Sequence, residues 1–305
     1  MFAQIEQHSF LPNQKSEIPL VLIRGFSKAL FSTWFHVPEV RSVFDAGEGI
    51  NFSMGGRLSK VDAVFLSHGH TDHFTGLLNL LIARTRLAPL ESSIPPVQVY
   101  FPGKAQNLVR YIDYVKQHLE ANDFPPVVEF HSVSAGDEFP HPTLSRHFIR
   151  VFEVKHGPLP AVGYCVFETR DKVREAYADL EPREVGRKIG EVGKEEVLKS
   201  VDVALVCYSG DTECAIEAPC HQPKLLLHEA TFLTEEDRRS TDHATLAEAL
   251  EAARLMEPAE MLLFHFSARY EAEDIRGAVE RQLGETPLPK TNVLYALPGR
   301  VFVGP

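Results

Sequence analysis

The sequence predicts an α/β fold, of the α+β kind, in which short buried strands end at polar side chains. Three observations favour this fold class. The apolar runs at 63–66, 201–207 and 261–264 have the length and composition of buried strands. An apolar helical pattern follows the first run, and an Ala-rich segment after Thr245 has a glutamate at the position that completes a helix capping box. Each of the three runs leads into a histidine or an aspartate, so the candidate chemistry lies at strand ends.

The length of 305 residues and the ordinary composition indicate a globular protein, which we expect to be a single domain over residues 1–305. No apolar run approaches the roughly 20 residues that cross a bilayer. The first residues have neither the basic nor the apolar region of a secretory signal. We therefore expect a soluble cytoplasmic protein that does not bind membranes.

Four cysteines, at positions 165, 207, 214 and 220, lack the Cys-x-x-Cys spacing of common zinc sites. Reduced thiols in a cytoplasmic enzyme are the simplest interpretation. A zinc site that uses Cys214 and Cys220 is the alternative.

The most informative stretch is Ser-His-Gly-His-Thr-Asp-His at 67–73, directly after the first predicted strand. Because side chains alternate along an extended chain, His68 and His70 lie on the same side. Asp72 and His73 follow at the turn into the helix, where they can face a second centre. Imidazole nitrogens and carboxylate oxygens are the ligands of zinc and related ions. A simple helix cap is the alternative, but it leaves the three histidines unexplained.

Four further candidates, Asp45, His156, Asp211 and His265, each follow a strand-like segment. A residue directly after a strand is well placed to reach a site at the sheet edge. The carboxylate of Asp211 can bridge two metal ions through its two oxygens. A turn-forming role before glycine is the alternative for Asp45.

These motifs resemble those of a known family. The segment 68–73 is similar to the HxHxDH signature of the metallo-β-lactamase superfamily, which builds a two-metal hydrolase in a four-layer αββα sandwich. Three later motifs, at 228–232, 242–245 and 265–270, resemble those of ribonuclease Z, the tRNA 3′-processing endonuclease, and of related phosphodiesterases. The resemblance covers about residues 43–270. The Gly-rich loop and the Pro-x-x-x-Arg motif that usually open the family's sequences are not evident here.

The resemblance implies a site for two divalent metal ions. The first ion would be held by His68, His70 and His156, the second by Asp72, His73 and His265, and Asp211 would bridge them. Asp45 would brace this site through hydrogen bonds rather than as a ligand. Zinc is the expected metal, with manganese and iron as alternatives. Two such ions, roughly 3.5–4 Å apart, lower the pKa of a shared water toward 7.

The same resemblance implies a catalytic mechanism in which the activated water attacks a phosphodiester. His243 matches the histidine that protonates the leaving 3′ oxygen, and Glu229 matches the carboxylate that orients it. General acid help of this kind is typically worth ~10²–10⁴-fold. Asp72, His243 and Glu229 are therefore the candidate catalytic residues.

The expected substrate is a phosphodiester, in particular the 3′ trailer of a precursor tRNA, and family analogy implies a homodimer. One alternative is a hydrolase of the same fold that cleaves a cyclic phosphodiester, a lactone or a thioester. The other is a non-catalytic binding protein, although none of the seven ligand positions has lost its ligand type.

Residues 170–200 form the main change in composition along the chain, because basic and acidic residues alternate densely there. A solvated pair of helices is the simple interpretation. In ribonuclease Z the corresponding segment carries an arm that binds the tRNA. Here the segment is short and lacks a Gly-Pro-rich tip, so we expect a charged insertion that acts as a reduced substrate arm, with Arg183, Arg187 and Lys188 near phosphates. The net charge of −11 argues against a broad nucleic-acid-binding surface but is compatible with such a local cluster.

Overall fold

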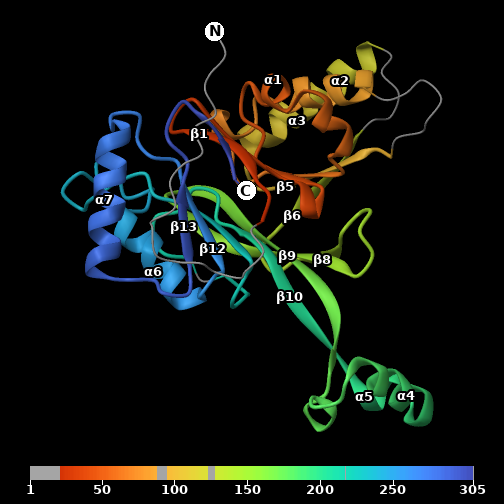
Figure 1. Ribbon diagram of the computed structural model, residues 1–305. Helices are drawn as coiled ribbons and strands as arrows, with labels where there is room; N and C mark the ends of the chain where they lie inside the picture. Colours follow the sequence, from red (N-terminus) through yellow and green to blue (C-terminus); the bar gives the residue numbers. More distant parts are fainter. Residues whose placement is uncertain (1–20, 88–94, 123–127, 217, 305) are drawn as a thin grey trace.

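Two seven-stranded sheets lie face to face at the centre of the molecule (Figure 1). The computed structural model describes residues 21–87, 95–122, 128–216 and 218–304. From edge to edge, the first sheet contains β14 (Val301–Val303), β1 (Arg24–Lys28), β2 (Ser32–Val37), β3 (Ser42–Phe44), β4 (Ala63–Phe65), β5 (Val97–Pro102) and β6 (Val128–Val133). The second sheet contains β13 (Asn292–Tyr295), β12 (Glu260–Phe264), β11 (Leu225–Glu229), β10 (Leu198–Tyr208), β9 (Leu159–Val173), β8 (His147–His156) and β7 (Glu138–Pro140).

Helices cover the outer face of each sheet (Figure 1). The first sheet is covered by α1 (Ile50–Met54), α2 (Leu77–Leu87) and α3 (Gln106–Ala121). The second sheet is covered by α6 (Leu246–Met256) and α7 (Ala272–Glu285). Three apolar cores fill the spaces between these four layers. The expected αββα sandwich is therefore confirmed.

The start of α6 shows how local sequence defines an element. The Thr245 hydroxyl accepts a hydrogen bond from the Glu248 backbone N–H (3.3 Å), and the Glu248 carboxylate accepts one from the Thr245 backbone N–H (2.8 Å). This is the predicted capping box. Such a cap is worth about 1 kcal/mol, and here it begins the helix directly after the segment that carries His243.

Strand direction brings the predicted site residues to one edge of the sandwich. In the first sheet, β3 to β6 run parallel, and in the second sheet β10 to β13 run parallel. β8 and β10 are both antiparallel to β9, so these two strands also end at the same edge. The predicted His, Asp and Glu residues lie at or just after the carboxyl ends of β4, β8, β10, β11 and β12.

The opening of the chain contains an apolar segment that does not form a strand. Apolar pieces within 17–31 predict the first strands, but residues 17–20 lie outside the described part of the chain and β1 covers only Arg24–Lys28. The apolar residues that follow form the tight turn into β2, where Phe31 N–H donates to the Lys28 carbonyl (3.0 Å) and Leu30 has a φ of 72°. Apolar character alone did not distinguish a strand from an exposed turn.

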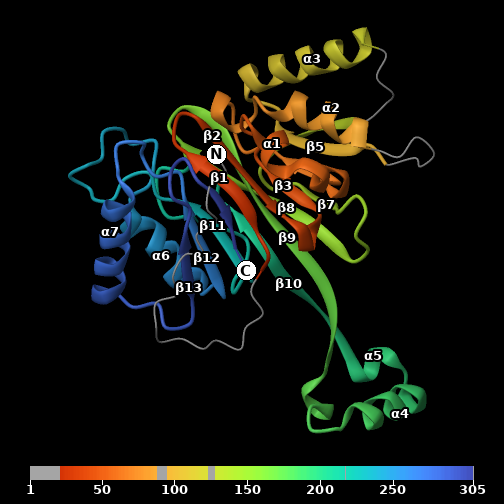
Figure 2. The same cartoon turned by 45° about the horizontal axis from the view of Figure 1, so that its top comes forward.

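The segment at 170–200 forms an arm. β9 and β10 continue past the body of the sheet as a two-stranded ribbon from the Arg170–Val201 pair outward, and we call residues 170–201 the arm. Its tip carries three short helices: η4 (Glu175–Tyr177), α4 (Pro182–Val192) and α5 (Lys194–Val197). Both views show the arm projecting away from the sandwich (Figures 1 and 2).

The remaining short helices, η1 (Pro38–Val40), η2 (Gly55–Lys60) and η3 (Thr71–His73), connect elements of the first sheet. Within the described ranges, none of the helices combines the length and the apolar character needed to cross a bilayer.

Candidate metal centre

Seven predicted ligands from both sheets converge at the shared edge of the sandwich. The first sheet supplies the segment after β4, where His70 precedes η3. The second sheet supplies one residue from each of three strand ends: His156 is the last residue of β8, Asp211 follows β10 and His265 follows β12.

The ligand atoms form two groups, in each of which all atoms lie within 4.8 Å of one another. One group is His68, His70, His156 and Asp211, and the other is Asp72, His73 and His265. The carboxylate of Asp211 faces both groups, because its Oδ2 lies 3.5 Å from His68 Nε2, 3.3 Å from His73 Nε2 and 3.4 Å from His265 Nε2. Burial opposes ionisation of Asp211, but the neighbouring imidazoles outweigh it and hold the pKa of this carboxyl well below its usual range.

The cluster contains polar atoms that are buried and unpaired. Among the described residues, Nε2 of His68, His73 and His265 and both carboxylate oxygens of Asp211 have no hydrogen-bond partner. A buried polar atom without a partner costs about 1–3 kcal/mol, so five of them at one place indicate atoms that bind a ligand. Imidazole nitrogens and carboxylate oxygens are the donors that zinc and similar divalent ions prefer. The residues therefore fit the divalent metals that the fold implies.

Hydrogen bonds at Nδ1 orient four of the histidines, so that each points its Nε2 away from the bonded partner. The oxygen atoms that lie within hydrogen-bond distance of Nδ1 are Ser67 Oγ for His68 (2.9 Å), Asp45 Oδ2 for His73 (2.6 Å), the Asp242 carbonyl for His156 (2.7 Å) and Thr231 Oγ1 for His265 (2.8 Å). Partners of this kind set the orientation and basicity of metal-binding histidines. The sequence prediction named only Asp45 among them, although Asp242 and Thr231 lie within the family-like motifs.

Asp45 is fully buried behind the two groups of ligand atoms. Its Oδ1 accepts from the Ser67 backbone N–H (2.8 Å), and its Oδ2 accepts from the Ser67 hydroxyl (2.8 Å), the Tyr208 hydroxyl (2.5 Å) and His73 Nδ1 (2.6 Å). Asp45 also lies within 4.8 Å of His68 and His73, but these bonds occupy its oxygens. The geometry favours a bracing role over direct ligation.

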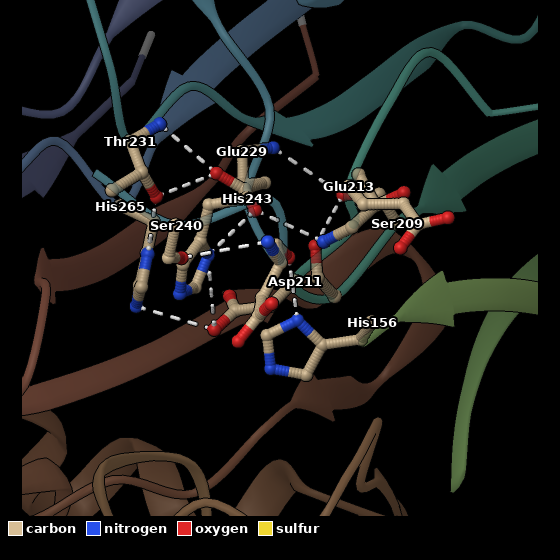
Figure 3. A network of polar contacts seen from close by, with 12 residues as sticks. His156, Ser209, Asp211, Glu213, Glu229, Thr231, Ser240, His243 and His265 are labelled. Carbon is tan, nitrogen blue, oxygen red and sulfur yellow. Dashed lines mark hydrogen bonds and ion pairs between the residues drawn. The ribbon is translucent and has the colours of Figure 1, made fainter. Parts of the chain in front are cut away.

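His243 and Glu229 form a pair beside Asp211 (Figure 3). His243 Nδ1 lies 2.9 Å from Glu229 Oε1 and 3.9 Å from Asp211 Oδ2. Burial opposes protonation of His243, but the Glu229 carboxylate outweighs it and raises the pKa of this imidazole to about 9. The ring can therefore carry a proton at neutral pH, with Nε2 free of the Glu229 contact.

Glu229 is itself held rigidly, since it is fully buried at the end of β11. Its Oε1 accepts from the Thr212 backbone N–H (3.0 Å), and its Oε2 accepts from the Thr231 backbone N–H (2.9 Å) and hydroxyl (2.6 Å). Thr231 also contacts His265, so one threonine links the His243–Glu229 pair to the ligand group that contains His265.

A cavity of about 420 Å³ opens next to His156. Lys104, Lys155 and Glu213 are among the side chains that line it. Glu153 also lines it, so the two lysines are matched by two glutamates, and the lysine amines are the groups that could contact a phosphate.

The alternative zinc site from Cys214 and Cys220 finds no support in the described residues, because no group of possible metal ligands there includes Cys214. Cys220 instead lies in a group with Cys165 and Cys207, on the helix-covered face of the second sheet, and Cys214 does not belong to that group. The spacing of the cysteines carried no signal for this arrangement, because it depends on how β9 and β10 pair.

Comparison with known proteins agrees with the fold and the ligand pattern. Residues 41–190 match the family model described as a beta-lactamase superfamily domain. Ribonuclease Z of Pyrococcus horikoshii is 30% identical over 77% of this chain and 79% of its own, and ribonuclease Z of Thermococcus sibiricus is 30% identical over 70% and 72%.

Among solved structures, the short form of human tRNase Z has a TM-score of 0.57 at 19% identity and covers 93% of this chain and 99% of its own. A metallo-β-lactamase fold protein from Bacillus subtilis has a TM-score of 0.59 at 14% identity, covering 93% and 100%. These two likenesses concern the fold alone, whereas the archaeal relatives define the family. The chain therefore belongs to the ribonuclease Z family and is a metal-dependent hydrolase with the metallo-β-lactamase fold.

Proposed function

We propose that this chain is a phosphodiesterase that removes the 3′ trailer from precursor tRNA, as the name ribonuclease Z of its relatives suggests. The observation that carries the proposal is the His243–Glu229 pair, 2.9 Å apart, beside the cluster of unpaired ligand atoms. A hydrolase that needed only an activated water would not require a protonated imidazole, His243, beside the metal ligands.

The proposed ligands of two divalent ions are His68, His70 and His156 for one, Asp72, His73 and His265 for the other, and Asp211 for both. When bound, such ions activate a water molecule and neutralise charge on the phosphoryl oxygens. Zinc is the proposed metal, because its preferred ligands match this mixture of imidazoles and carboxylates.

The residues of the chain supply the proton and its position. As the bond between phosphorus and the 3′ oxygen breaks, that oxygen takes the proton from Nε2 of His243. Glu229 stabilises the protonated imidazole before transfer and keeps its ring in place. Thr212 and Thr231 hold Glu229, so the donor is positioned before the substrate arrives.

Substrate binding would use two regions. The cavity beside His156, with Lys104 and Lys155, would accept nucleotides next to the scissile phosphate. The arm would contact the body of the tRNA, since Arg183 and Arg187 on α4 are exposed to solvent. We also propose that the enzyme acts in the cytoplasm and as a homodimer, both by analogy with its family.

The test compares two substrates, a precursor tRNA with a 3′ trailer and bis(p-nitrophenyl) phosphate, with the wild type and a His243→Ala variant. We expect cleavage just after the discriminator base, and a loss of about 10²–10⁴-fold in the variant. The small diester has a good leaving group that needs less protonation, so its hydrolysis should fall less.

Two results would contradict the proposal. Turnover of the small diester alone would indicate a phosphodiesterase with another natural substrate. Inactivity on both substrates, with two metals bound, would direct the search to cyclic phosphodiester, lactone and thioester substrates.

A further inference from the structure

Three cysteine sulfurs meet on the far side of the second sheet from the inter-sheet core. Cys165 on β9 and Cys207 on β10 are directly opposite each other in the antiparallel ladder. Their Sγ atoms lie 3.2 Å apart, and Cys220 Sγ lies 3.5 Å from Cys165 Sγ. All three sulfurs lie within 4.8 Å of one another.

This group is separate from the candidate metal centre. Side chains alternate along β9 and β10, so Tyr164 and Tyr208 point into the inter-sheet core while Cys165 and Cys207 point to the face covered by α6 and α7. None of the three cysteines is among the seven proposed ligands of that centre. The mechanism proposed above makes no use of them.

We propose that Cys165, Cys207 and Cys220 form a three-thiolate site for a thiophilic d¹⁰ ion, with monovalent copper as the ion that matches it best. Thiolates are soft ligands that select Cu(I), zinc and iron–sulfur clusters. Structural zinc sites are almost always four-coordinate, and within the described residues this group offers three ligand atoms. Three sulfurs without a fourth ligand correspond to the trigonal coordination that Cu(I) accepts.

The surroundings determine how the ion would enter. Cys165 and Cys207 are fully buried, whereas Cys220 is only half-buried and lies in the connection between β10 and β11. Entry from solvent would therefore begin at Cys220. Hydrogen bonds from Cys165 and Cys207 lower the pKa of the Cys220 thiol to about 4, so Cys220 is already a thiolate at neutral pH. On binding, the thiols of Cys165 and Cys207 release two protons to solvent and three sulfur–copper bonds form, with no change of oxidation state.

The charge of the loaded site also has a counterpart. Burial raises the pKa of the Cys165 and Cys207 thiols well above the usual range, so both are neutral without an ion. Three thiolates around Cu(I) leave two negative charges. The Arg150 guanidinium lies over the rings of Phe148 and Phe167 at 5.0 and 4.7 Å, on the same face, and its charge favours the thiolate of Cys165. Arg150 also donates to Glu138 Oε2 (2.6 Å) and lies 3.8 Å from Asp202, so it offsets only part of the charge.

The experiment titrates the full-length protein, first loaded with zinc at the His/Asp centre, with Cu(I) under anaerobic conditions against a coloured Cu(I) chelator. We expect one Cu(I) per chain and an X-ray absorption spectrum with three sulfur neighbours. Cys220→Ser should weaken Cu(I) binding by at least about 100-fold. It removes a ligand, whereas loss of a residue that only orients a ligand typically costs 10–100-fold. Cys214→Ser is the matched control, since Cys214 is a nearby cysteine outside the group, and it should bind like the wild type.

Three results would overturn the proposal. In the first, Cu(I) stays with the chelator, and in the second, the Cys220→Ser variant binds Cu(I) as tightly as the wild type. Either would mean that the three cysteines only pack in the core and bind no ion. Equal losses in the Cys214→Ser and Cys220→Ser variants would indicate non-specific thiol binding. The circular dichroism spectrum of each variant shows that it is folded, and none of these measurements depends on catalytic activity.

Discussion

The edge of the sandwich and the arm differ sharply, although β9 and β10 run through both. At the edge, Asp45, Asp211 and Glu229 are carboxylates with 0–1% of their surface exposed, held among imidazoles and hydroxyls. In the arm, α4 has no buried residue, and its ion pairs join exposed side chains of the same helix, as Lys188 does with Glu191 (3.1 Å).

This difference separates two physical tasks. Chemistry on phosphorus needs charges that are fixed in place before the substrate arrives, and burial among hydrogen-bond donors provides that. Contact with a large polyanion needs reach and exposed basic side chains. The two-stranded ribbon provides the reach, and Arg183 and Arg187 are exposed on α4, although the acidic residues of the arm balance its basic ones in number. The predictions below test whether the edge and the arm are separable in this way.

The largest effect is expected for Asp211→Asn. Because a neutral amide cannot supply the charge that the carboxylate offers to both ligand groups, we expect loss of at least about 100-fold in activity on the small diester and on precursor tRNA. Metal analysis of the purified variant should show fewer bound ions. Asp202→Asn is the control, since Asp202 lies on the same strand but is exposed where the arm begins, and it should keep both activities. A fully active Asp211→Asn variant would remove Asp211 from the centre.

A smaller loss is expected for Asp45→Asn. The amide can keep some of the four hydrogen bonds to Ser67, His73 and Tyr208 but not the negative charge beside His73. Supporting residues of this kind typically change metal affinity or activity by 10–100-fold, and we expect a loss in that range with metal affinity reduced. Asp62→Asn separates this effect from stability, because Asp62 is a buried aspartate of the same sheet region that pairs with Arg41 and Thr143 instead. It should lower the melting temperature without lowering metal affinity.

Charge reversal in the arm should spare the chemistry. For the triple variant Arg183→Glu, Arg187→Glu, Lys188→Glu, we expect an increase of about ten-fold in KM for precursor tRNA and no change in turnover of the small diester. The salt dependence of tRNA binding should also become shallower, by about one unit of slope per lost phosphate contact. Reversal of Arg281 on α7, which is exposed on the sandwich, is the control. An equal loss on both substrates would mean that the arm and the edge are not separable.

The sequence allowed prediction of the edge much more completely than of the arm. A strand followed by His, Asp or Glu is a local pattern, so His68, His156, Asp211 and His265 could be located before the structure was known. Their hydrogen-bond partners could not, because the contact between Thr231 and His265 depends on how β11 and β12 pair.

The shape of the arm depends on non-local pairing in the same way. Alternating charges at 170–200 indicated solvent exposure, and α4 and α5 account for the predicted helices. The ribbon that carries them is formed by cross-strand pairs such as Lys172–Lys199, between residues far apart in the chain, which composition does not reveal. The same is true of the cysteine group, whose members lie on two strands and a loop.

The smallest effect concerns stability and not activity, and it again separates the sandwich from the arm. His36 on β2 is 3% exposed, and neither ring nitrogen has a hydrogen-bond partner within the described residues. Burial, together with Arg57 and Arg24, lowers the pKa of His36 from 6.5 to about 4. The arm residues at 170–200 contain no histidine.

A lowered pKa means that the unfolded chain binds the proton first, so His36 supports the fold fully above pH 6.5 and less as the pH falls toward 4. Since one pKa unit corresponds to about 1.4 kcal/mol, the loss over this range is about 3 kcal/mol. We therefore expect the free energy of unfolding of a His36→Phe variant to fall by about 3 kcal/mol less than that of the wild type between pH 6.5 and 4, as measured by urea denaturation. At pH 8 the two proteins differ in their free energy of unfolding only through the packing of the larger ring. This difference is subtracted from the differences at lower pH. If both proteins lost stability equally over this range, His36 would not be a source of acid sensitivity in the sandwich.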